Sequence, residues 1–268
     1  MESNGLIISI KKCSYMIYHP KRTKKVEGTK LYLGNDEIKK VDSLTFLGIR
    51  MDDSLKFSEQ INNLKSKLKS ALSALKQVKF SLNYKAKFLI YNGLFQSHLE
   101  YCFITYGNKI NKTQLQEIKL IQKKALRILF SARFNTHCSK LYQLSGITPV
   151  DELLEKESLI FMKKYCNNLQ PKAFEEIIGE PKIDSLRSSS EKTYKIPKNL
   201  KVNDCFYDIL SSWNKADKVI KEAKNHKELK SILKKRSTKN QSEYSCKVKK
   251  CYSCKKDKKR DFEKYMKK

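Results

Sequence analysis

The chain has 268 residues, of which 40% are hydrophobic and 32% are charged, a composition that allows one large or two small domains with a buried core. Its 57 Lys+Arg against 28 Asp+Glu leave a formal net charge of +29, and an excess of this size is typical of proteins that bind nucleic acid. Because no apolar stretch approaches the ~18 residues of a membrane-spanning helix, and no apolar leader precedes a cleavage site, we expect no membrane partner, no secretion signal, and a location in the cytoplasm or nucleus.

The first part of the chain is predicted to be rich in β-strands. Short β-prone runs at 6–10, 15–18, 30–33 and 44–49 are separated by lysine pairs, a proline and a Gly-Asn-Asp turn signal. Alternation of short apolar runs with turn residues is typical of a small sheet region rather than of helices.

After this region the hydrophobic period becomes helical. Apolar residues recur three or four positions apart over 57–78, which indicates one buried helix face with lysines opposite it. A second helix is expected over 88–99, and a third from Thr113, whose hydroxyl can form a capping box with Gln116. Thr148, followed by a proline and two acids, predicts the N-cap of a fourth helix.

The fold class expected from these elements is α+β, and the chain divides into five parts. A β-rich region (1–53) precedes a mainly α-helical bundle (54–170), a loose linker (171–202), a small helical segment (203–233) and a basic tail (234–268). The tail carries 15 Lys+Arg and 4 Asp+Glu. We expect it to be disordered when unbound, because it has too little apolar surface to offset the entropy cost of ordering.

Several short motifs follow one another in a characteristic order. They read NGL at 4–6, KCSYMIY at 12–18, FLGI at 46–49, YCFITYG at 101–107, IQKKALRI at 121–128, GITPV at 146–150 and WN at 213–214. Their order resembles the C-terminal half of non-LTR (LINE-like, Jockey-type) retrotransposon reverse transcriptases, which are RNA-directed DNA polymerases. In that family the first motif lies just after the acidic hairpin of the palm. The resemblance therefore implies a palm remnant, a thumb-like bundle and a following segment, with the rest of the polymerase as a missing upstream partner.

The resemblance also assigns roles to four residues of the β-rich region. Lys12 matches the lysine that follows the catalytic strands of the palm and lies near the incoming nucleotide. Phe46, Leu47 and Gly48 match the primer-grip hairpin, where a tight backbone turn holds the primer end. These four residues are therefore expected to contact nucleic acid.

Catalysis by this chain alone is not expected. Polymerase chemistry requires two Mg²⁺ ions held by carboxylates from two separate strands. The chain has one pair of adjacent aspartates, Asp52 and Asp53, and a predicted helix follows it, so we interpret the pair as acids at the positive end of that helix. The sequence thus predicts no catalytic residue and no cofactor for this chain, and Mg²⁺ is implied only for the full-length family enzyme.

Three cysteines of the tail have a spacing that suits a metal. Cys246, Cys251 and Cys254 form a C-x4-C-x2-C pattern, and thiolates two residues apart are suitable ligands for Zn²⁺. A closed zinc site needs four ligands, however, and no Cys or His follows Cys254, so free thiols in a basic tail are the alternative. The other five cysteines lie in apolar or mixed surroundings and are predicted to be unreactive.

Basic side chains opposite the apolar helix stripes are predicted to contact the phosphates of a template–primer duplex. Such contacts set position and read little sequence. The residues concerned are Lys65, Lys69, Lys76, Lys123, Lys124 and Arg127. Gln122, between them, is interpreted either as part of this surface or as an ordinary exposed helix residue. The alternative function for the whole chain is a basic helical protein–protein adaptor, whose charge serves solubility or localisation.

Overall fold

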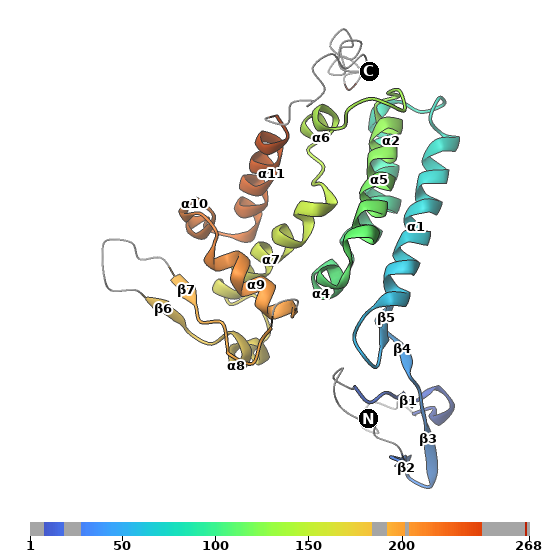
Figure 1. Cartoon of the computed structure of the whole chain (residues 1–268), viewed down its shortest axis with the longest axis vertical. Coiled ribbons are helices and arrows are strands. Elements are labelled where there is room, and N and C mark those ends of the chain that lie inside the picture. The colour runs from blue at the N-terminus through green and yellow to red at the C-terminus, as the bar shows by residue number, and fades with distance from the viewer. Residues whose placement is uncertain (1–7, 19–27, 184–191, 202–203, 243–265, 267–268) are drawn as a thin grey trace. The chain divides into compact units, whose positions relative to one another are not determined.

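The computed structural model describes residues 8–18, 28–183, 192–201, 204–242 and 266. Its contacts divide the chain into two compact units, Met1–Leu64 and Lys65–Lys268. The first unit contains a small β-sheet region and the second is mainly helical, which confirms the predicted α+β class (Figure 1). In the part of the chain so described, no helix is both long and apolar enough to cross a membrane.

The first unit contains a three-stranded sheet. Strand β3 (Asp36–Lys40) lies in the centre, with β1 (Ser14–Tyr15) parallel and β2 (Leu31–Leu33) antiparallel to it. The predicted strand at 6–10 is wrong over its described part, where the backbone enters the 3-10 turn η2 (Ile10–Lys12). All three side chains of β2 are exposed, so the sheet buries little apolar surface of its own.

A two-stranded hairpin follows the sheet. Strand β4 (Ser43–Phe46) pairs with β5 (Ile49–Asp52), so the predicted continuous run over 44–49 is interrupted by a turn. The turn residues Leu47 and Gly48 have φ values of +47° and +79°. Positive φ at both central residues matches the right-handed twist of the flanking strands. Glycine adopts this backbone freely, whereas leucine does so only at a cost.

Helices α1 to α7 follow the hairpin. Helix α5 begins with a capping box between Asn111 and Gln114, whose side chain and backbone exchange hydrogen bonds. The predicted box of Thr113 and Gln116 is therefore wrong by two residues. The bounds are α1 (Ser58–Gln77), α2 (Tyr84–Ile90), the π-helical η3 (Tyr91–Gln96), α3 (Ser97–Glu100), α4 (Phe103–Tyr106), the 3-10 turn η4 (Gly107–Lys109), α5 (Lys112–Leu129), α6 (Ser139–Ser145) and α7 (Val150–Cys166).

Further elements follow α7. They are η5 (Lys172–Phe174), α8 (Glu175–Ile178), β6 (Pro181–Ile183), β7 (Lys192–Tyr194), α9 (Cys205–Asn214), α10 (Lys218–Glu222) and α11 (His226–Ser242). Among them, α9 and α11 pack directly against α7. One apolar core joins Leu159 and Met162 of α7 to Leu210 and Trp213 of α9 and to Leu229 of α11. The buried Trp213 thus belongs to the same core as the apolar face of α7.

This core differs from the predicted domain division. The segment 171–202 was expected to be a loose linker, yet Ile178 and Tyr194 from it are buried in the core shared with α7 and α9. Isolated apolar residues between lysines and prolines show no periodicity, which is why the pattern gave no sign of their burial. The segments 171–202 and 203–233 therefore belong to the second unit rather than forming separate parts.

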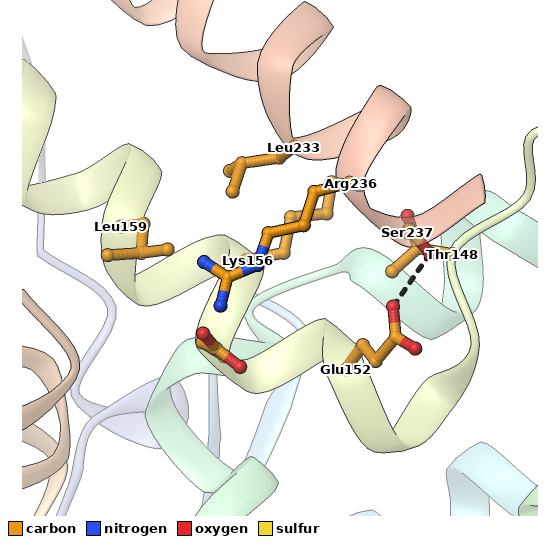
Figure 2. Close-up of a pocket in the computed structure, with 8 residues that line it drawn as sticks. Thr148, Glu152, Lys156, Leu159, Leu233, Arg236 and Ser237 are labelled. Atoms are coloured by element: carbon orange, nitrogen blue, oxygen red, sulfur yellow. Dashed lines mark hydrogen bonds between the residues drawn. The ribbon is translucent and has the colours of Figure 1, made fainter. Parts of the chain in front are cut away.

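Helix α11 extends past the predicted start of the tail at residue 234. Ser237 is buried, and its hydroxyl donates a hydrogen bond of 2.6 Å to the Glu152 carboxylate of α7 (Figure 2). Arg236 forms an ion pair of 3.3 Å with Asp217. The hollow between α7 and α11 measures about 70 Å³, room for a few water molecules rather than a ligand. The first nine residues of the predicted tail are thus helical, and Ser237 among them packs against α7.

A fully buried lysine connects three segments of the second unit. The ammonium of Lys87 in α2 donates to the Ser131 hydroxyl at 3.1 Å and to the carbonyls of Ile128 at 3.3 Å and Lys79 at 3.4 Å. Ile128 lies in the last turn of α5, and Lys79 follows the end of α1. Helix C-termini carry unpaired carbonyls and partial negative charge, so a single cation can satisfy both ends.

Two further lysines act in the same way around α10. The buried Lys163 of α7 donates to the carbonyl of Lys221 at 3.0 Å, and the ammonium of Lys221 donates to the carbonyl of Asn214 at 3.3 Å. Asn214 is the last residue of α9. Lysine side chains therefore satisfy the free carbonyls at the C-termini of several helices in this basic chain.

Replacing Lys87 by methionine should lower the free energy of unfolding by about 2 kcal/mol, because it leaves buried carbonyls and a hydroxyl without their donor. Lys85→Met, at an exposed position of the same helix, should change stability by less than about 0.5 kcal/mol. Urea denaturation followed by circular dichroism measures both values, and equal stabilities of the two variants would contradict the assignment.

Candidate nucleic-acid interface

The predicted basic residues of α1 and α5 lie in the second unit. Lys69 and Lys76 of α1 and Lys124 of α5 are exposed, and Lys123 is half-buried. Lys65 is different, because its ammonium pairs with the Glu117 carboxylate of α5 at 3.0 Å and its side chain is only 17% exposed. Lys65 therefore connects α1 to α5 rather than facing water alone, contrary to the prediction from its helix position.

Arg127 also contacts protein. Its Nε donates a hydrogen bond of 2.9 Å to the carbonyl of Thr136, and the thiol of Cys138 lies 3.7 Å from the carbonyl of Lys123. These two contacts hold the segment between α5 and α6 against α5. Arg127 is thus a positioning residue for this segment, while Lys123 and Lys124 remain the better candidates for phosphate contact on α5.

Acidic residues are absent from two long stretches that meet in the helical unit. Residues 65–99 contain seven lysines and residues 118–150 contain six Lys+Arg, and neither stretch contains Asp or Glu. Helix α5 contacts both α2 and α6, so the two stretches are neighbours in space. We call their combined exposed surface the acid-free surface.

Ion pairs lie at the borders of the acid-free surface. Three of the acids that flank the two stretches are Glu100, Glu117 and Asp151, and the fourth, Glu59, belongs to the first unit. Glu117 pairs with Lys65, Asp151 with Lys119 at 2.6 Å, and Glu100 with Lys156 at 2.7 Å. The nearest carboxylates in sequence are therefore already engaged at the edges, and the positive potential of the interior of the surface is left for an external anion.

A buried glutamine fixes the rotation of α5. The amide of Gln122 accepts hydrogen bonds from the Tyr142 hydroxyl at 2.8 Å and from the backbone N–H of Val150 at 3.0 Å. It donates to the Thr148 carbonyl at 3.0 Å and lies 3.5 Å from the Tyr91 hydroxyl. Gln122 is fully buried, so neither predicted interpretation, surface contact or ordinary exposed residue, is correct.

Gln122 replaces the expected cap of α7. Pro149 precedes the first helical residue, and no side chain of its own caps the helix, so the predicted role of Thr148 as N-cap is wrong. The first N–H of α7 instead bonds to Gln122 from α5. Burial raises the pKa of both Tyr91 and Tyr142, which keeps their hydroxyls protonated in this network.

The four residues that the resemblance assigns to the β-rich region lie in the first unit. Lys12 is exposed at the end of η2. Phe46 and Leu47 are 61% and 74% exposed beside Gly48 at the tip of the hairpin. A tight turn with exposed apolar side chains is thus present where the primer-grip match lies.

Asp52 closes a turn between β5 and α1. One oxygen of its carboxylate accepts hydrogen bonds from the Ser54 hydroxyl at 2.7 Å and from the backbone N–H groups of Lys56 at 2.9 Å and Ser54 at 3.1 Å. Because α1 begins at Ser58, the interpretation of Asp52 and Asp53 as acids of the first helical turn is wrong. Burial raises the pKa of Asp52, but the hydrogen bonds outweigh burial and lower it.

The described part of the chain has no metal site that could replace this pair. Among the described residues, no group of three or more His, Cys, Asp or Glu side chains could hold a metal ion. Cys246, Cys251 and Cys254 lie outside the described residues. Of the described cysteines, Cys205 donates to the Ile104 carbonyl at 3.1 Å, and burial raises its pKa to about 11. A thiol held protonated in this way is a poor nucleophile and a poor metal ligand.

Comparison of the chain with family models, curated proteins and solved structures found no match.

Replacing Gln122 by methionine should cost about 3 kcal/mol of folding stability, because the substitution leaves several buried polar groups without partners. The matched control is Gln116→Met at an exposed position of α5, which should change stability by less than about 0.5 kcal/mol. Thermal unfolding of both variants provides the comparison. If Gln122→Met were as stable as the control, the proposed α5–α7 link would be wrong.

The lowered pKa of Asp52 predicts a pH-dependent contribution to stability. Since the folded-state pKa lies below that of the unfolded chain, this contribution is present above the unfolded pKa, about 4, and is lost as the pH falls through the folded value. The stability difference between wild type and Asp52→Asn should therefore be constant near neutral pH and shrink on acidification below about pH 4. Carboxyl-carbon NMR titration of Asp52 checks the direction independently, and a pKa above the ordinary aspartate value would contradict it.

Proposed function

We propose that the chain is the nucleic-acid-gripping part of a retrotransposon-type reverse transcriptase, and that its acid-free surface binds the phosphates of an RNA/DNA template–primer duplex. The observation that carries the proposal is the absence of acids from two neighbouring stretches whose border carboxylates already pair with lysines. A surface of one sign attracts a polyanion, and contacts of this kind position the duplex without reading bases.

The proposal assigns binding but no catalytic residue to this chain. Mg²⁺ would belong to carboxylates of an upstream polymerase region, with which this chain would act in the cytoplasm or nucleus. The exposure of Leu31, Tyr32 and Leu33 on β2 supports packing against such a region, because a strand with so much exposed apolar surface is stabilised by a covering partner.

The structure narrows the set of residues that should carry the duplex contacts. Lys65 and Arg127 hold protein partners, so substituting them would change the fold as well as the charge. Lys69, Lys76, Lys123 and Lys124 are the better test set, because no carboxylate of the described residues lies within ion-pair distance of them.

Changing these four lysines to glutamine should weaken duplex binding about equally for all sequences. The slope of log affinity against log salt should fall by about one per lysine that contacts a phosphate. Stability should change little, because exposed lysines seldom hold a fold together. Fluorescence anisotropy with a labelled RNA/DNA duplex at several salt concentrations measures affinity and slope together.

The matched control removes the same charge from another surface. Lys215, Lys224, Lys227 and Lys235 are exposed residues of the α9–α11 region, and their combined change to glutamine should leave the slope nearly unchanged. Equal slopes for wild type and both variants would contradict the proposal and favour the adaptor function. An equal loss of duplex affinity in both variants would mean that net charge alone, rather than this surface, attracts the duplex.

A further inference from the structure

Two phenylalanines are the most exposed large apolar side chains of the described residues. Phe80, in the connection between α1 and α2, is 88% exposed, and Phe134, in the connection between α5 and α6, is 89% exposed. Figure 1 shows both connections at the same end of the helices. Covering the two aromatic rings with a binding partner would gain burial energy of about 1.5–3 kcal/mol each.

Buried contacts join the two connections. The ammonium of Lys87 bonds both to the carbonyl of Lys79, next to Phe80, and to the hydroxyl of Ser131, three residues before Phe134. The rings of Tyr84 and Phe130 also pack against each other, with centroids 5.0 Å apart. The loops that carry the two phenylalanines are therefore held side by side on a rigid base.

The surroundings of both rings are cationic. The ammonium of Lys79 lies 4.9 Å from the centre of the Phe80 ring. Arg133 precedes Phe134 and is exposed, as is Lys140 at the start of α6. Both connections lie within the acid-free surface, so no carboxylate of residues 65–99 or 118–150 offsets these charges. Exposed aromatic faces among cations are the combination that binds single-stranded nucleic acid, by stacking bases and pairing phosphates.

We infer that Phe80 and Phe134 form a stacking site for unpaired nucleotides. The inference rests on the proposed function, and it adds that an unpaired strand next to the duplex binds at this end of the helices. The basic loops would hold the phosphates, while the rings stack on bases with little sequence preference. An anionic membrane is the rival partner for apolar residues among cations, but membrane-surface binding usually requires a continuous apolar helix face, which these two short loops lack.

The test compares a blunt RNA/DNA duplex with the same duplex carrying an overhang of about eight nucleotides, within the size range of single-strand sites. The full chain should bind the overhang duplex more tightly than the blunt one. Phe80→Leu and Phe134→Leu, which keep an apolar side chain but remove the stacking face, should each weaken overhang binding by about fivefold, the lower end of the loss expected for one stacked base. Because no charge is removed, the salt slope should stay as in the wild type.

Leu89→Ala is the matched control, since Leu89 is 71% exposed on α2 and has no aromatic face. It should leave the overhang preference intact. Photo-cross-linking of an overhang containing 5-iodouracil, mapped by mass spectrometry, should identify Phe80 or Phe134 without any substitution.

The outcomes separate the stacking site from the proposed function on which it rests. Blunt and overhang duplexes bound equally, or a preference that survives both phenylalanine changes, would overturn the stacking site and leave the proposed function standing. Failure to bind either duplex would overturn both. Wild-type binding to phosphatidylserine–phosphatidylcholine vesicles that both phenylalanine changes remove, without an overhang preference, would show that the site is for lipid.

Discussion

The bond between a buried lysine ammonium and helix-terminal carbonyls organises the helical unit. The Lys87 ammonium bonds to carbonyls at the ends of α1 and α5. Lys163 bonds to a carbonyl of α10, and Lys221 of α10 bonds to the last carbonyl of α9. Because the Lys87 ammonium is fully buried, it is stable only where it finds several oxygen partners, and the ends of two helices supply them with partial negative charge. The helices and the loops that follow them are therefore fixed to one another at their ends.

The described lysines differ in their partners. Some bond to carbonyls, as Lys87 and Lys163 do, or pair with Glu117, Asp151 and Glu100, and these connect segments of the protein. Lys69, Lys76 and Lys124 are exposed instead. With a net charge of +29, outward lysines repel one another unless an anion lies between them. On a surface without acids no carboxylate offsets that repulsion, so an external polyanion would relieve it.

Two of the motifs that carry the reverse-transcriptase resemblance contact each other directly. Gln122, from the motif at 121–128, binds the backbone of Thr148 and Val150, from the motif at 146–150. The motif at 213–214 has a comparable role, since the amide of Asn214 exchanges two hydrogen bonds with the backbone of Tyr194. These motif residues stabilise the fold, so they would be retained whether or not the chain binds nucleic acid. Substitutions of the exposed basic and aromatic side chains are therefore what distinguishes nucleic-acid binding from the adaptor function.

The sequence by itself determined the α+β class, the β-rich start and the long helices α1, α5 and α7, because apolar periodicity depends on near neighbours in the chain. It also located the outward lysines of α1 and α5. Only the tertiary structure decided which polar residues are buried. The partners of Lys87 and Gln122 lie up to 44 and 31 positions away, so no local pattern could show that a lysine terminates a distant helix or that a glutamine caps one. The packing of 171–202 and of Ser237 depended in the same way on contacts with α7 and α9, which exist only once the chain has folded.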